Sequence, residues 1–167
     1  NLKYYTLSGK ILDTLNHQPV QGIKVKLNEL ESITDENGIF TFPDLESHIF
    51  YVFEPFSEEY LFHPPKRSNR LLQDTFNVFT AYKPMYSISG TIYDSTSKQP
   101  LSGITVNMGA IAATSDEQGK YIFSPIMSGD SYSLVPTSAH YIFHPSQRTF
   151  TLQKDTTGLD FAGELQT

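Results

Sequence analysis

The chain has 167 residues, a net charge of −6 and no cysteine. Without thiols there are no disulfides, thiolate zinc sites, iron–sulfur clusters or cysteine nucleophiles. The excess of acidic residues argues against the strongly basic footprint that is typical of proteins that bind nucleic acid or anionic membranes. We therefore expect no nucleic-acid partner. No apolar run approaches the ~18 residues of a membrane-spanning helix, so we also expect no membrane insertion.

An internal repeat sets the domain organisation. An offset of 81 residues aligns residues 4–75 with 85–156 without a gap. The motif Ser-Gly-x-Ile-x-Asp begins at Ser8 and again at Ser89, and Gln-Pro-x-x-Gly-Ile-x-Val begins at Gln18 and again at Gln99. A repeated pattern of this length predicts tandem copies of one module. We place the first domain at residues 1–83 and the second at 84–167.

Within one copy the periodicity is that of strands, because apolar and polar side chains alternate. In chain order we expect strands over 7–13 and 23–27, a strand after the turn at 34–38, then strands near 51–53, 60–62, 66–72 and 75–81. Residues 28–33 and 109–113 fit an exposed loop or an edge strand. Turns recur roughly every 8–12 residues, which is typical of an all-β sandwich.

The most regular element is the turn that begins Asp35-Glu36-Asn37-Gly38 and returns as Asp116-Glu117-Gln118-Gly119. A carboxylate such as that of Asp35 or Asp116 can accept hydrogen bonds from nearby backbone N–H groups, and Gly38 and Gly119 can adopt a positive φ. A calcium site is the alternative, but it needs six or more oxygen ligands and the later ones are missing. We interpret these four residues as structural turn residues.

The ordered motifs Ser-Gly-x-Ile-x-Asp, Gln-Pro-x-x-Gly-Ile-x-Val, Asp-Glu-x-Gly-x-(Phe/Tyr)-x-Phe and Tyr-x-Phe-x-Pro resemble the carboxypeptidase regulatory-like domains. These are prealbumin-like (transthyretin-like) sandwiches related to collagen-adhesin B repeats. The resemblance covers nearly the whole chain, twice. It implies two tandem Greek-key, Ig-like β-sandwich domains of about seven strands each, a non-catalytic role and an extracellular or cell-surface location. Relatives serve as stalks, adhesion modules or accessory domains beside enzymes.

Catalytic and metal chemistry finds little support. His63 and His144 occupy equivalent places before proline, without the spacing of a metal site. Lys10, Asn77 and Glu54 would be needed for an isopeptide bond like that of the adhesin relatives, but alternation turns Lys10 and Glu54 away from the core. There is no Gly-x-Ser-x-Gly elbow and no phosphate-binding loop. We predict no enzyme, no metal and no cofactor.

Aromatic side chains near strand ends are the remaining signal. Most of them are expected to complete two small cores, because domains of ~80 residues need large side chains to bury enough area. Six lie where a flat ring could stack on a sugar or dock a protein partner: Tyr4, Phe50, Phe56, Tyr60, Tyr82 and Tyr141. Of these we select Phe56, Tyr60 and Tyr141 as candidate ligand contacts. Phe56 is the strongest candidate, because its loop reads differently in the second copy.

Three functions remain open. The first is a structural or interaction module, a stalk or spacer with possible adhesion, in a larger bacterial surface or secreted protein. Only about four residues join the two copies, and one is a proline, so we expect a restricted end-to-end pose. The second is a carbohydrate-binding accessory module, marked by two or three coplanar exposed aromatic rings. The third is subunit assembly through exposed strand edges. The expected partners are a polysaccharide or a protein, and we read the chain as an excised or mature piece, monomeric by itself.

Overall fold

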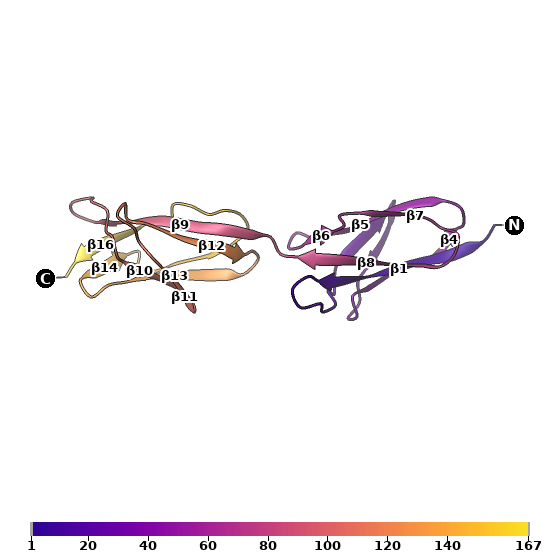
Figure 1. The fold of residues 1–167 in the computed structure, drawn as a ribbon, viewed down its shortest axis with the longest axis horizontal. Helices are drawn as coiled ribbons and strands as arrows, with labels where there is room; N and C mark the ends of the chain where they lie inside the picture. The colour runs from indigo at the N-terminus through magenta and orange to yellow at the C-terminus, as the bar shows by residue number, and fades with distance from the viewer. Residues whose placement is uncertain (1, 167) are drawn as a thin grey trace. The chain divides into compact units, whose positions relative to one another are not determined.

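The computed structural model describes residues 2–166, which form sixteen β-strands and no helix (Figure 1). The predicted all-β fold is confirmed. The strands fall into two compact units, Asn1–Lys83 and Pro84–Thr167, which we call repeat one and repeat two. Residues 2–166 contain no helix that is long and apolar enough to cross a bilayer.

Repeat one is a sandwich of two four-stranded sheets, with strand orders β4-β1-β8-β6 and β3-β2-β5-β7. Its eight strands are one more than the resemblance implies, because residues 30–33 pair with β2 as an edge strand. The strands are β1 (Tyr4–Asp13), β2 (Lys24–Leu27), β3 (Leu30–Ile33), β4 (Ile39–Glu46), β5 (Phe50–Phe56), β6 (Leu61–His63), β7 (Arg67–Arg70) and β8 (Thr75–Tyr82).

Repeat two has the same plan, with orders β12-β9-β16-β14 and β11-β10-β13-β15. In both repeats the first and last strands pair in parallel, and the other pairs are antiparallel. The strands are β9 (Met85–Asp94), β10 (Thr105–Met108), β11 (Ile111–Thr114), β12 (Lys120–Met127), β13 (Ser131–Thr137), β14 (Tyr141–His144), β15 (Arg148–Thr151) and β16 (Phe161–Leu165).

Each core lies between the two sheets and is built from the inward-facing residues of alternating strands. In repeat one Phe40, Phe53 and Phe79 are fully buried, and their ring centroids are 5.9–6.1 Å apart. Such tilted and edge-to-face contacts add stabilisation beyond the buried area. Repeat two places Tyr121 and Leu134 at the positions of Phe40 and Phe53.

The repeats differ at the parallel pair. In repeat one β1 and β8 stay in one register from Leu7–Thr75 to Asp13–Ala81. In repeat two Ile88 bridges Thr156 in the equivalent register, but Ile92 pairs with Phe161, one residue further along. The stretch between contains Gly158, whose φ is +74°. One extra residue is therefore accommodated by an interruption of the ladder.

This interruption is matched by a change in the core. The Tyr121 hydroxyl donates a hydrogen bond to the backbone carbonyl of Leu159, within the interrupted stretch. Phe40, the equivalent residue of repeat one, has no hydroxyl, and its ring packs beside an uninterrupted strand. Burial, together with the nearby Asp160 carboxylate, raises the pKa of Tyr121 well above its ordinary value.

We predict that Tyr121→Phe lowers the free energy of unfolding at neutral pH by about 1 kcal/mol, because one buried hydrogen bond is lost. In the unfolded chain the phenol releases its proton near pH 10.0, whereas the folded protein retains it. The free energy of unfolding of the native protein should therefore fall as the pH rises above about 10, and that of the Tyr121→Phe variant should fall less over the same range. Urea unfolding between pH 7 and 11 measures both effects; parallel curves for the two proteins would contradict the assignment.

Candidate functional site

The two acidic turns have the geometry of backbone-capping loops. Asp35 Oδ1 accepts hydrogen bonds from the backbone N–H groups of Asn37 and Ile39, both at 2.9 Å. Asp116 Oδ1 accepts from Gln118 at 3.0 Å and Lys120 at 2.8 Å. These oxygens already serve the backbone, which favours a structural role over a cation site.

The glycines of these turns are required by the backbone. Gly38 and Gly119 both have φ = +72°, a conformation that side-chain-bearing residues rarely adopt. A Cβ on Gly38 would also lie 2.6 Å from the carbonyl oxygen of Ile11, and one on Gly119 would lie 2.3 Å from that of Ile92. The turn is thus packed against the first strand of its own repeat.

The potential catalytic and metal-binding residues are dispersed. Within residues 2–166 no three histidine, aspartate or glutamate side chains gather as a metal site would require. His144 Nε2 lies 3.3 Å from Glu164 in an exposed pair. Of the residues that an isopeptide bond would use, Glu54 is exposed on β5, opposite Lys26, while the Asn77 side chain accepts a hydrogen bond from Asn69.

A polar hollow of about 490 Å³ lies between β7 and β8 in repeat one. Asn69, Asp74, Thr75 and Asn77 are among the residues that line it. Thr75 Oγ1 and Asn77 Nδ2 are buried there without a protein hydrogen-bond partner. Buried polar atoms of this kind are ordinarily satisfied by ordered water, which this hollow can admit.

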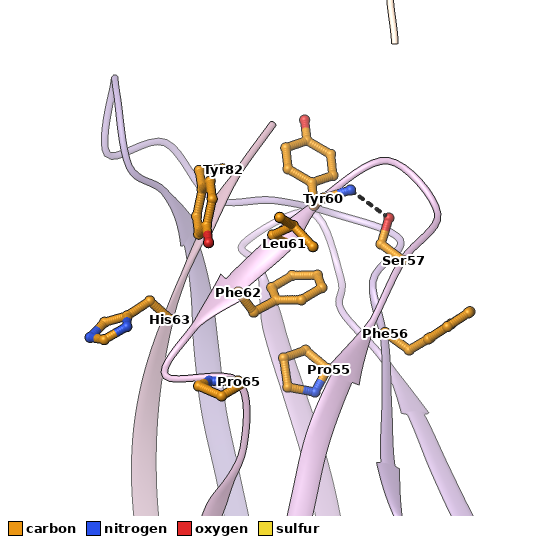
Figure 2. A pocket seen from close by; sticks show the side chains of 9 residues that line it. All are labelled: Pro55, Phe56, Ser57, Tyr60, Leu61, Phe62, His63, Pro65 and Tyr82. Atoms are coloured by element: carbon orange, nitrogen blue, oxygen red, sulfur yellow. Dashed lines mark hydrogen bonds between the residues drawn. The ribbon is translucent and has the colours of Figure 1, made fainter. Parts of the chain in front are cut away.

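A larger, open hollow of about 540 Å³ lies at the end of repeat one where β5, β6 and β8 meet (Figure 2). It contains two of the three predicted ligand-contact residues, Phe56 and Tyr60. Its lining consists of Pro55, Phe56, Ser57, Tyr60, Leu61, Phe62, His63, Pro65 and Tyr82.

The aromatic rings of this hollow do not converge on one point. Figure 2 shows the Phe56 ring directed away from Phe62, whereas the neighbouring Pro55 lies on the inner side of β5. Tyr60 is half-buried against the core, and its backbone N–H donates to Ser57 Oγ at 3.2 Å. The rings therefore form no common stacking platform in this hollow.

Tyr60 is also held by charged neighbours. Lys83 Nζ lies 5.6 Å from the centre of the Tyr60 ring and 2.5 Å from a carboxylate oxygen of Glu59. Tyr141, at the position of Tyr60 in repeat two, is half-buried with its ring centre 6.4 Å from that of Phe143. Both tyrosines thus contribute to packing as well as to the surface, and their role as ligand contacts stays a prediction.

Tyr82 is one of the six aromatic residues that the sequence places near strand ends or in loops, but it is not one of the three selected as ligand contacts. Its side chain is 41 % exposed and lines the hollow. Pairing in the ladder places Tyr82 opposite Leu61, and Glu164 opposite Ile142 in repeat two. The gapless alignment would have compared Tyr82 with Gly163 instead. Because repeat two contains one additional residue before this position, the gapless alignment does not show that an aromatic residue of repeat one corresponds to an acidic residue of repeat two.

Exposed aromatic side chains are confined to one repeat. Among the described residues, those in the exposed class are Tyr4, Phe50, Phe56, Phe76 and Tyr82. All belong to repeat one, although the two repeats share one fold. These rings are therefore not demanded by the sandwich itself, which makes the surface of repeat one the better candidate for recognition.

We predict that Asp35→Ala and Asp116→Ala each reduce the free energy of unfolding by about 1–3 kcal/mol, because two backbone N–H groups lose a charged acceptor. Urea unfolding followed by circular dichroism measures the change. Glu36→Ala, at an exposed position of the same turn, is the control and should be near neutral. Equal effects of Asp35→Ala and Glu36→Ala would show that the carboxylate does not stabilise the turn.

Comparison with known proteins supports the fold. Residues 85–162 match a family model described as "BOS complex subunit NOMO1-like, second beta sandwich domain". The TIE protein of Bacillus anthracis superposes with a TM-score of 0.78 at 12 % identity, over 97 % of this chain and 34 % of that one. A minor pilin of Streptococcus agalactiae, GBS52, superposes with a TM-score of only 0.45 at 14 % identity, over 98 % of this chain and 97 % of that one.

One curated relative is an enzyme. Chitinase ChiA of Flavobacterium johnsoniae is 24 % identical over 136 residues, which is 79 % of this chain. The chain spans only 8 % of the length of that relative. The similarity therefore concerns a small part of a much larger protein.

Proposed function

We propose that this chain is a non-catalytic structural module of a larger surface or secreted protein, in which two sandwich repeats act as a spacer. The observation that supports this is the connection between repeats. β8 ends at Tyr82 and β9 begins at Met85, so only Lys83 and Pro84 join them. A connection this short, with one proline, limits the conformations that two linked domains can adopt.

The spacer proposal predicts a restricted distance between the repeats. The chain has no native cysteine, so spin labels on Glu36→Cys and Glu117→Cys report one distance between two exposed, equivalent turns. We expect a narrow distance distribution in pulsed electron paramagnetic resonance. Four Gly/Ser residues inserted after Lys83 should broaden it. If the distance distribution of the native chain is as broad as that of the insertion variant, the spacer proposal is wrong.

A second candidate function is an accessory module of a secreted polysaccharide-degrading enzyme. The similarity to a chitinase favours it, as do the exposed aromatic rings of repeat one. On this proposal the chain contributes binding rather than catalysis, and flat rings contact the C–H faces of sugars.

The test is a pull-down on chitin and a screen against other glycans. We expect specific retention that Phe56→Ala weakens severalfold, because its ring is 56 % exposed and available for contact. Thr137→Ala, at the equivalent position of repeat two, is the matched control and should bind like the native chain. If Phe56→Ala does not change retention, Phe56 is not part of the binding site. If the chain binds no glycan in the screen, the spacer proposal is the candidate function that stays.

A further inference from the structure

The outer face of the sheet β3-β2-β5-β7 in repeat one carries a line of apolar side chains. Along β5, Tyr51 and Phe53 are buried, while Phe50, Val52 and Phe56 point outward. Glu54 lies on the same side, between Val52 and Phe56. Their exposed fractions are 69 %, 49 % and 56 %. Six residues of a strand span about 20 Å, so the two phenylalanines mark the ends of an elongated surface.

Basic side chains from the neighbouring strands flank this line. In the ladder Arg70 of β7 lies opposite Phe50, and Lys24 of β2 lies opposite Phe56. The ammonium of Lys24 is paired with the Glu31 carboxylate at 3.0 Å. Lys26 Nζ lies 5.5 Å from the centre of the Phe56 ring. Lys66, just before β7, joins Val52 at a hollow of about 350 Å³ midway along the surface.

The local charge differs from that of the whole repeat. This surface, which we call the β5 face, carries Lys24, Lys26, Lys66 and Arg70, four of the eight basic residues of residues 1–83. It carries only two of the eleven acidic residues there, Glu31 and Glu54. Repeat one has a net charge of 8 − 11 = −3, whereas this face has a net charge of 4 − 2 = +2, with Lys24 paired to Glu31 and Lys26 opposite Glu54 in the ladder.

Repeat two shows that the fold does not require this composition. At the equivalent positions of the sheet β11-β10-β13-β15 the side chains are small or uncharged. Ser131 and Thr137 replace Phe50 and Phe56, and Asn107 replaces Lys26. Thr105, Gln147 and Thr151 replace the other three basic residues. Two sheets of the same topology thus present a charged aromatic face and a neutral polar one.

We propose that the β5 face binds an extended anionic polysaccharide, such as a uronic-acid polymer. The exposed rings contact the C–H faces of successive sugars, and the ammonium groups of Lys26 and Lys66 and the guanidinium group of Arg70 bind their carboxylates. The elongated shape suits a linear polymer, and the local excess of cations selects an acidic one. The proposal deepens the second candidate function, on which it rests, by naming the surface and the class of polymer.

Affinity electrophoresis of the full chain at low salt tests it, with polygalacturonate as the anionic polymer and hydroxyethyl cellulose as the neutral one. We expect retardation by polygalacturonate that weakens as salt is added. The double variants Phe50→Ala/Phe56→Ala and Lys26→Gln/Arg70→Gln should each weaken binding about tenfold. Ser131→Ala/Thr137→Ala is the matched control and should migrate like the native chain, and circular dichroism checks that every variant is folded.

Several outcomes would overturn the proposal. If the chain is retarded by hydroxyethyl cellulose or retained on chitin but does not bind polygalacturonate, the second candidate function stands and the proposal of an anionic ligand is wrong. Binding to vesicles containing phosphatidylserine, but not to polygalacturonate, would make the face a lipid surface. A dimer abolished by Phe50→Ala/Phe56→Ala would make it an interface between copies. Each result is independent of the spin-label distance, so the spacer proposal is judged separately.

Discussion

The structure depends on packing large apolar side chains between two small sheets. A repeat of about 80 residues has little volume in which to bury surface, and Phe40, Phe53 and Phe79 fill the centre of repeat one with contacts near 6 Å between ring centres. Strand alternation then sends every second side chain outward. Because those outward positions contribute little to the core, they can change between repeats without changing the fold.

The core itself changes less freely. Replacement of Phe40 by Tyr121 in repeat two adds a hydroxyl to a buried position, where an unpaired polar group would be costly. The carbonyl of Leu159 accepts its hydrogen bond, and this carbonyl lies where the β9–β16 ladder is interrupted by one additional residue. Side chain and backbone therefore differ together at this place in the fold.

The outer faces differ much more. Repeat one presents exposed rings and clustered basic groups on β5 and its neighbours, whereas repeat two presents serine, threonine and asparagine on the same scaffold. The proposed functions use this difference: both repeats provide length, and repeat one also provides recognition. Conversely, the hollow between β5, β6 and β8 contains Phe56 and Tyr60, but the divergence of their rings makes it a poorer stacking surface than the β5 face.

The sequence alone determined the repeat, the strand periodicity and the turns at Asp35 and Asp116, because these depend on residues near one another in the chain. Tertiary structure decided what depends on register between distant strands. Only pairing brings Lys26 of β2 and Arg70 of β7 beside the phenylalanines of β5. Strand pairing also shows that Tyr82 of repeat one corresponds to Glu164 of repeat two. The gapless sequence alignment misses this correspondence, because repeat two has one additional residue before its last strand.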